Sequence, residues 1–430
     1  MNYIRKILDN DMNIILVPDN HTQIITTGFF VKAGSRNETD DNSGIAHFLE
    51  HMMFKGTTHR TANTLFEELD ILGSQYNAGT TTQHTYFYIY GNMDDTKKIL
   101  DITLDIYINA VFNEKEINKE KKVIIEEMRM RSDSPMMKLY STMHQKIFSG
   151  TSLGRDIIGN IDTIMNFTKT DLVEFRTSLY KPENTVFVVT GNFNPDAIFK
   201  IISKVLSPLK NSSKSPTTYF HERPIIMENM ESQTEPYVYV KQNKKFKQVY
   251  VLLAFPMYDL YSYKYREIDL LTQLLTAGFS SRLSKALRED NGITYASNAY
   301  PIVYSDSGIY LLQMVVNPTE FIEGLKIMLD ELKKIKEKLM TKKEMSKIIN
   351  VTKNDTIYSL INPIDVLLYF GINFLIDRNF KPNIDKEFSE IKEITRKQVM
   401  TVAKEIFVYD KINLFIYGNV DEKDYDFLDL

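Results

Sequence analysis

The sequence predicts an α+β protein built from two similar domains, each a mostly antiparallel sheet packed with helices. Three observations support this prediction. The 430 residues exceed what one hydrophobic core usually organises. Short segments rich in β-branched and aromatic residues alternate with longer amphipathic segments. A segment near the middle of the chain also recurs near its end. We therefore predict domains at 1–215 and 216–430, joined at the polar stretch Asn211–Pro216.

The internal repeat aligns Thr168–Asn192 without gaps with Thr395–Asn419. The apolar positions of a helix match between the copies, and a strand ending in Gly-Asn follows each helix. The matching residues of the two predicted helices are Leu172 and Val399, Phe175 and Val402, and Leu179 and Ile406. Chance similarity is the alternative, but the two copies lie about half the chain apart, which favours a duplicated domain.

Hydrophobic periodicity predicts the elements of the first half in order. Asn77–Tyr90 is rich in Thr, Tyr and Phe and predicts one strand. The remaining predictions are a hairpin over 3–17 that turns at 9–11, a strand at 24–31, helices at 61–72, 96–111, 113–130 and 168–179, and a strand at 185–189.

The second half predicts the same kinds of element. Strands are expected at 237–240 and 249–255, and helices at 266–277 and 280–288. Long lysine-rich helices occupy about 319–349, and their Lys and Glu residues are interpreted as solvated faces.

Composition limits the possible partners and cofactors. The formal net charge is −4 with 25% charged residues, which argues against nucleic acid as a partner. Cysteine is absent, so a metal site would have to use histidine and carboxylate ligands. No apolar segment follows the basic residues near the N-terminus, and the longest apolar runs are too short to span a membrane. We therefore expect a cytoplasmic protein without a membrane partner.

The stretch His47–His51 suggests a metal site. His47 and His51 are four residues apart, so on a helix they share one face, and Glu50 projects beside them. Two imidazoles can supply two zinc ligands, and a neighbouring carboxylate can act as a general base. The helix is expected to begin after one of three possible N-caps and to end near a glycine. These residues are Asp41, Asn42, Ser43 and Gly56. The alternative is two partly buried histidines beside a surface glutamate.

A third ligand can be sought on the predicted helix that contains Glu120 and Glu127. These residues are seven apart and therefore share a face, although a charged surface helix is the simpler interpretation in isolation. Six of the seven histidines lie in the first half, and the alignment of the two copies, when extended, places Leu274 opposite His47. Any histidine-based site is therefore expected in the first domain alone.

Several motifs together resemble the pitrilysin-type zinc peptidases, the inverzincin family that includes insulysin and the mitochondrial processing peptidase. His47–His51 followed by Phe54–Thr57 resembles the family signature closely. Further matching segments occur in the same order along nearly the whole chain. They are Tyr76–Thr80 with Thr85-Tyr86, Glu120–Glu127, Leu153–Gly159, Ser281–Leu283 and Arg288–Tyr295.

The resemblance implies one zinc ion per chain, held by His47, His51 and Glu127. It implies that Glu50 is the general base and that Glu120 supports the site from behind the ligands.

The resemblance also implies where a peptide would bind. Asn77, Ala78 and Thr80 match the edge strand along which the substrate backbone lies. Arg288 and Tyr295 match a pair that grips the substrate and stabilises the tetrahedral intermediate.

We therefore expect a zinc endopeptidase that hydrolyses peptides or unfolded segments in a closed chamber. The chain is half the size of the larger family members, so a homodimer with Arg288 and Tyr295 supplied in trans is the simplest expectation. A heterodimer with a non-catalytic relative is the alternative. Two other functions stay open: a non-catalytic scaffold or regulatory subunit of the same fold, and a metal-dependent hydrolase of another substrate.

Overall fold

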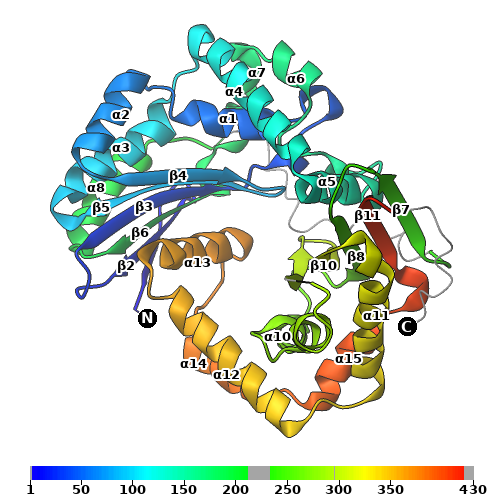
Figure 1. Cartoon of the computed structure of the whole chain (residues 1–430). Coiled ribbons are helices and arrows are strands. Elements are labelled where there is room, and N and C mark those ends of the chain that lie inside the picture. Colours follow the sequence, from blue (N-terminus) through cyan, green and yellow to red (C-terminus); the bar gives the residue numbers. More distant parts are fainter. Residues whose placement is uncertain (1, 212–232, 295, 421–430) are drawn as a thin grey trace. The chain divides into compact units, whose positions relative to one another are not determined.

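The computed structural model describes residues 2–211, 233–294 and 296–420 (Figure 1). Contacts divide the chain into two compact units. Unit 1 contains the described residues of Met1–Met130, Ser152–Thr217 and Tyr358–Asn383. Unit 2 contains the described residues of Arg131–Thr151, Thr218–Ile357 and Ile384–Leu430. Each unit therefore draws on both halves of the sequence. The predicted boundary at 215 lies outside the described residues and stays a prediction.

Unit 1 is organised on a six-stranded sheet in the order β1-β2-β6-β3-β5-β4. The strands are rich in Ile, Val, Phe and Tyr, which suit a pleated and largely buried surface. Only β2 and β6 pair in parallel, so the sheet is mostly antiparallel, as predicted. The strands are β1 Ile4–Ile7, β2 Asn13–Pro18, β3 Ile24–Val31, β4 Gln75–Thr80, β5 Thr85–Asn92 and β6 Thr185–Gly191.

Helices cover both faces of this sheet (Figure 1). One face packs against helices from the first half of the sequence, and the other packs against α13 Pro363–Ile376 from the second half. The first-half helices are α1 Ile45–Met53, α2 Ala62–Ile71, α3 Thr96–Asn109, α4 Glu114–Asp133, α6 Ile161–Asn166, α7 Lys169–Leu179 and α8 Pro195–Leu206.

The close approach of α13 to β3 depends on a glycine. A Cβ atom added at Gly371 would lie 2.2 Å from the ring of Phe30, which is fully buried on β3. Phe370 and Phe374 flank this point and are also fully buried. Burying each such side chain stabilises the unit by about 1.5–3 kcal/mol, so α13 belongs to the core of unit 1.

Unit 2 repeats the arrangement with a five-stranded sheet in the order β7-β11-β8-β10-β9. Its one parallel pair is again near the start of the order, β7 with β11. The strands are β7 Tyr237–Gln242, β8 Val249–Met257, β9 Ser297–Val303, β10 Gly308–Val316 and β11 Asn413–Gly418. The helices are α5 Pro135–Ile147, α10 Tyr265–Thr276, α11 Phe321–Glu337, α12 Lys342–Ser359, α14 Ile384–Glu393 and α15 Arg396–Ile406, with π-helical turns at Ser284–Glu289.

The two units confirm the predicted pair of similar α+β domains. The repeated segments form α7 with β6 and α15 with β11. Both helices begin with a capping box, Thr168 with Asp171 and Thr395 with Gln398. Each half of the sequence contributes one helix to the other half's sheet. The second half supplies α13 to unit 1, and the first half supplies α5, which packs against β8 and β11 of unit 2.

One element prediction was wrong. Asn77–Tyr90 forms a hairpin of β4 and β5 instead of one strand. The chain reverses at Thr81–His84, where the Thr81 backbone N–H donates to the His84 carbonyl at 2.8 Å and the Thr81 hydroxyl accepts from the His84 N–H at 3.0 Å. Threonine favours strands by propensity, but its hydroxyl can also close a turn, and that role prevails here.

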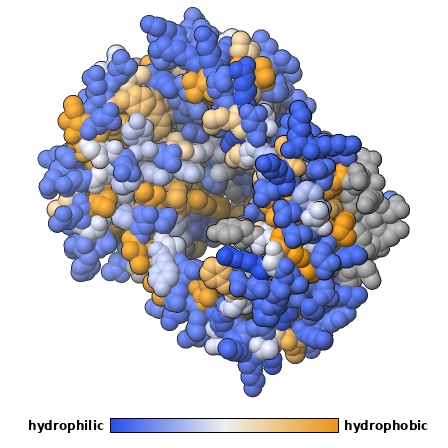
Figure 2. Space-filling model, in the orientation of Figure 1, coloured by the Kyte–Doolittle hydropathy of each residue, from blue (hydrophilic) through white to orange (hydrophobic). Residues whose placement is uncertain are grey.

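Hydrophilic residues predominate on the face of the molecule drawn in Figure 2, and apolar residues form small groups among them. No single helix in the described ranges is both long and apolar enough to span a membrane. The helices α12 and α13 meet that requirement only as a bent pair, and most apolar side chains of α13 are buried or partly buried in unit 1.

Candidate metal centre

The short helix α1 carries the centre, and a buried carboxylate fixes its first turn. Its N-cap is Gly44, whose φ of 94° is a left-handed conformation that favours glycine. The backbone N–H groups of Gly44 and Ala46 donate to the two oxygens of Glu38 at 2.8 and 2.9 Å. The N-cap predictions of Asp41, Asn42 and Ser43 were therefore wrong. Glu38, which lies six residues before Gly44, takes the capping role instead.

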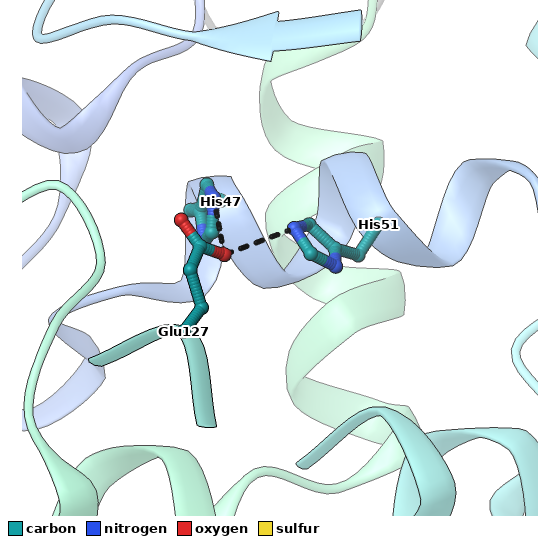
Figure 3. A group of neighbouring side chains, drawn as sticks. All are labelled: His47, His51 and Glu127. Atoms are coloured by element: carbon teal, nitrogen blue, oxygen red, sulfur yellow. Dashed lines mark ion pairs between the residues drawn. The ribbon is translucent and has the colours of Figure 1, made fainter. Parts of the chain in front are cut away.

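His47, His51 and Glu127 converge on one point (Figure 3). The two histidines lie on one face of α1, and Glu127 reaches them from α4. Glu127 Oε2 lies 3.8 Å from His47 Nε2 and 3.7 Å from His51 Nε2. The potential ligand atoms of the three residues all lie within 4.8 Å of one another. Three ligand atoms from two helices therefore surround a space of the size of a metal ion.

A second carboxylate orients His51. His51 Nδ1 donates to Glu120 Oε1 at 2.8 Å, which leaves Nε2 directed toward Glu127. Lys55 donates to the other oxygen of Glu120, also at 2.8 Å. Burial opposes the charged form of His51, but its bond to Glu120 and the nearby carboxylates outweigh burial and raise the pKa of His51. Burial likewise opposes the charged form of Glu120, but its bonds to His51 and Lys55 lower its pKa.

Glu50 precedes His51 on α1, is buried, and interacts electrostatically with His51 and Glu127. Its Oε2 accepts a hydrogen bond of 3.0 Å from the Thr80 hydroxyl on β4. Burial raises the pKa of Glu50, against the opposing effects of His51 and the Thr80 hydroxyl. A carboxylate with a raised pKa is a stronger base than an exposed glutamate.

The donor set fits zinc. Ligand atoms about 2.0–2.1 Å from a tetrahedral zinc ion lie roughly 3.4 Å from one another. The separations of 3.7 and 3.8 Å are close to this value. Zinc-binding histidines usually donate their other ring N–H to a carboxylate, as His51 does to Glu120. Among the residues that the structure describes, no other group of this kind occurs.

The edge strand β4 carries the three residues predicted to bind substrate. β4 is the last strand in the sheet order and pairs with β5 alone. Asn77 is exposed, Ala78 and Thr80 are partly exposed, and the Thr80 hydroxyl links this edge to Glu50. An edge strand offers backbone groups with which an extended peptide can pair.

Arg288 and Tyr295 belong to the second half of the sequence. Arg288 lies in the π-helical turns of unit 2, where its guanidinium is 4.8 Å from the ring centre of Phe279 and 3.6 Å from the Glu289 carboxylate. Tyr295 lies outside the described residues. The grouped site residues in unit 1 are thus His47, Glu50, His51, Thr80, Glu120 and Glu127.

Three residues that contact α1, Glu120 or the turn after α1 were not predicted from the sequence: Glu38, Lys55 and Asp105. Glu38 gives no signal, because a helix cap is ordinarily sought next to the helix. Lys55 lies within the matched motif, and Asp105 lies in a segment that predicts only a helix. The contacts of Lys55 with Glu120 and of Asp105 with Thr57 form only when α1, α3 and α4 pack together.

Comparison with known proteins places the chain in a family. Residues 13–160 match the family described as Insulinase (Peptidase family M16). Residues 166–352 match the family described as Peptidase M16 inactive domain. The first match contains every member of the His47, His51 and Glu127 group, and the second contains Arg288.

Three relatives extend the match over most of the chain. An uncharacterized zinc protease of Rickettsia felis is 32% identical over 311 residues, 71% of each chain. The uncharacterized zinc protease YmxG of Bacillus subtilis is 26% identical over 93% of this chain and 95% of its own. The crystal structure of a protease from Helicobacter pylori superposes with a TM-score of 0.87 at 25% identity, over 97% of this chain and 99% of that one. The sequence matches and the shared fold together establish that the chain belongs to peptidase family M16.

Proposed function

We propose that this protein is a zinc-dependent endopeptidase that hydrolyses peptides or unfolded polypeptide segments. His47, His51 and Glu127 would hold one zinc ion per chain. The observation that carries the proposal is the convergence of these three ligand atoms beside the buried carboxylate of Glu50. Relatives named zinc proteases support the same conclusion.

The roles of the chain's own residues follow from their positions. Zinc, when bound, would polarise a carbonyl and lower the pKa of a water molecule. Glu50 would accept the proton of the attacking water and pass it to the leaving amine. Its raised pKa suits both steps, because a carboxyl group nearer neutrality exchanges protons in either direction more readily. Glu120 would keep His51 in the tautomer that presents Nε2 to the metal.

The substrate backbone would pair with the free edge of β4, along Asn77, Ala78 and Thr80. Thr80 bonds directly to Glu50, so a peptide on this edge would lie next to the general base. Arg288 and Tyr295 would grip the substrate and stabilise the tetrahedral intermediate. We propose that two copies of the chain enclose the substrate in a chamber, with Arg288 and Tyr295 supplied in trans.

A non-catalytic scaffold or regulatory subunit is the alternative function, and a heterodimer with a non-catalytic relative is the alternative assembly. The match of residues 166–352 to an inactive domain is compatible with the scaffold function. The complete set of ligands and base in unit 1 favours the peptidase, because a subunit without chemistry has no need of them.

The substitution Glu50→Gln tests the proposal. It keeps the shape of the side chain but removes the base, so the zinc content should stay unchanged and kcat should fall roughly 10²- to 10⁴-fold. Zinc content is measured by elemental mass spectrometry, and turnover is measured with an internally quenched peptide. Unchanged turnover would exclude Glu50 as the base.

The matched control is Glu126→Gln. Glu126 neighbours Glu127 on α4, but its side chain is 67% exposed and pairs with Arg129. This variant should keep both zinc and activity. A zinc-loaded wild-type protein that cleaves no member of a peptide library would instead support the scaffold function.

A further inference from the structure

We propose that Lys55 is a positioning residue of the metal centre, and that the turn at residues 56–61 holds Lys55 in place. Lys55 would fix Glu120 in the orientation in which Glu120 holds His51. The inference rests on the proposed role of His51 as a zinc ligand, and it adds a residue with no assigned part in that site.

The carboxylate of Glu120 is shared between two partners. Glu120 is only 4% exposed, and each of its oxygens has a separate role. Oε1 accepts from His51 Nδ1 and Oε2 accepts from Lys55 Nζ, both at 2.8 Å. With both oxygens engaged, the carboxylate cannot rotate about its terminal bond. Without Lys55 one oxygen loses its partner, and the carboxylate can turn away from His51.

Hydrogen bonds fix the backbone around Lys55. The Lys55 N–H donates to the Met52 carbonyl at 3.1 Å, which continues the last turn of α1. The next residues form a tight turn, in which Gly56 bridges to Thr61 and the Thr57 N–H donates to the Arg60 carbonyl at 2.8 Å. The direction in which Lys55 leaves α1 is therefore set by the turn that follows it.

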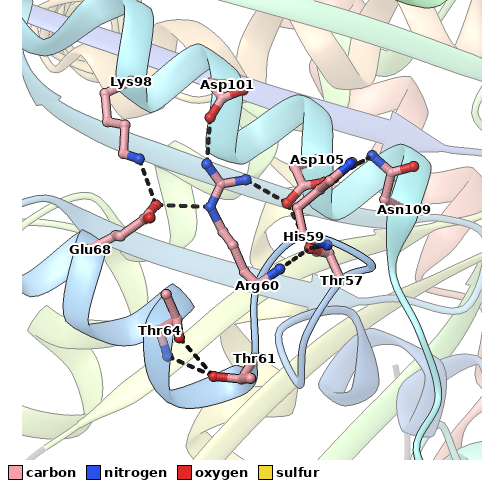
Figure 4. Close-up of polar contacts among 10 residues, drawn as sticks. All are labelled: Thr57, His59, Arg60, Thr61, Thr64, Glu68, Lys98, Asp101, Asp105 and Asn109. Atoms are coloured by element: carbon pink, nitrogen blue, oxygen red, sulfur yellow. Dashed lines mark hydrogen bonds and ion pairs between the residues drawn. The ribbon is translucent and has the colours of Figure 1, made fainter.

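Polar contacts drawn in Figure 4 anchor that turn to the neighbouring helices. Asp105 on α3 is buried and accepts hydrogen bonds from three residues of the turn. The donors are the Thr57 hydroxyl and His59 Nδ1, each at 2.7 Å, and Arg60 Nη1 at 2.5 Å. Arg60 also donates to Glu68 on α2 at 2.8 Å and pairs with Asp101 on α3. Side chains from two helices thus fasten the turn, as a fully satisfied polar network would.

A simpler role for Lys55 is to neutralise a buried carboxylate without any effect on the metal. The two roles differ in what they predict for zinc affinity. Neutralisation alone would change the stability of the apoprotein and leave zinc affinity unchanged. Positioning would change zinc affinity, because a misplaced His51 binds the metal less well.

The experiment measures the zinc dissociation constant of the full-length apoprotein by competition with a chromogenic chelator. Lys55→Met should weaken zinc binding by roughly 3- to 10-fold, less than the 10- to 100-fold typical of a direct partner of a ligand. Lys55→Arg keeps the charge and should bind within about 2-fold of wild type. Absorption of the cobalt-substituted proteins should show altered ligand geometry for Lys55→Met alone. Wild-type affinity in Lys55→Met, or equal weakening by both variants, would overturn the proposal.

Two further variants test the turn. Asp105→Asn should weaken zinc binding in the same direction, and an unchanged affinity would remove the turn from the proposal. Lys98→Met is the matched control, because Lys98 pairs with Glu68 at 2.8 Å in the same network but does not touch the turn. It should bind zinc as wild type does. If Asp105→Asn fails to fold, Lys55→Met and Lys55→Arg still decide the role of Lys55.

The variant His47→Leu separates this proposal from the proposed function. Zinc retained at wild-type affinity by His47→Leu would overturn the metal centre itself. Zinc lost by His47→Leu but bound normally by Lys55→Met would overturn only the role of Lys55.

Discussion

The helix pairs α1 with α4 in unit 1 and α10 with α12 in unit 2 occupy corresponding places in two similar folds. The first pair brings together two histidines and two glutamates. In the second pair, the described buried residues of α10 are all apolar. The alignment of the two copies, when extended, places Lys347 opposite Glu120 and Asn354 opposite Glu127. Unit 2 has therefore kept the packing of a helix pair without the side chains that could hold a metal.

One contact shows how closely the packing is kept. Glu120 on α4 reaches His51 near the C-terminal end of α1. Lys347 on α12 reaches the Ala277 carbonyl at the C-cap of α10, at 2.6 Å. A cation at a helix C-terminus is a stabilising contact that requires no metal. The same fold therefore accommodates either set of residues, and a metal site in unit 1 would depend on a few polar side chains.

The substitution His47→Leu should break the comparison most strongly, because it replaces a potential ligand of α1 with an apolar residue of the kind that α10 buries in unit 2. Loss of a ligand should weaken zinc binding by more than the roughly 100-fold that loss of an outer partner can cause, and peptide hydrolysis should cease. Zinc content and peptide turnover measure the effect. His21→Leu, at an exposed position, is the control and should keep both.

The two helices also begin differently, and the difference predicts a dependence on pH. Burial raises the pKa of Glu38 from 4.5 to about 8, against the two backbone N–H bonds that it accepts. Protonated Glu38 therefore adds to the free energy of unfolding. This contribution is fully present below pH 4.5 and is lost as the pH rises through about 8. At α10 the N-cap Lys264 makes no side-chain cap bond.

Deprotonation of Glu38 should lower the free energy of unfolding by on the order of a few kcal/mol at most. Urea unfolding of wild type and Glu38→Gln at pH 5, 7 and 8.5 measures it. Wild type should lose stability relative to the variant as the pH rises, because the variant has no proton to release at this position. Parallel profiles for the two proteins would contradict the prediction.

The exchanged helices offer a third test. Gly371 on α13 and His144 on α5 stand at matching positions of the two copies, and His144 packs against the Tyr304 ring with the ring centres 6.1 Å apart. Gly371→Ala should lower the free energy of unfolding by about 1–3 kcal/mol, because the clash with Phe30 exceeds the gain in helix propensity. Combining it with Phe30→Leu should recover part of the loss in a denaturation assay. Purely additive losses would show that the contact is not the cause.

The smallest effect is expected for Lys347→Met. It removes the bond to the Ala277 carbonyl and should lower the free energy of unfolding by about 0.5–1 kcal/mol, with zinc binding unchanged. Lys343→Met, exposed on the same helix, should have no measurable effect on the denaturation midpoint. A change in zinc binding would contradict the separation of the two units in function.

The sequence by itself determined the kinds of elements, the duplication and the placing of two histidines on one helix face. These depend on local periodicity, which the backbone of a helix or strand imposes on neighbouring positions. For the same reason the spacing of Glu120 and Glu127 placed both carboxylates on one face of α4. The family motifs also predicted that these two helices contribute ligands to one site.

Only the tertiary structure decided which distant residues complete these local patterns. The link from Lys55 through Glu120 to His51 and the packing of α13 on the first sheet join segments remote in sequence, and Glu38 caps α1 across the loop that precedes it. Such contacts depend on which faces are buried together, and burial decides whether a polar group must find a partner. The periodicity of the sequence does not show which faces are buried against each other.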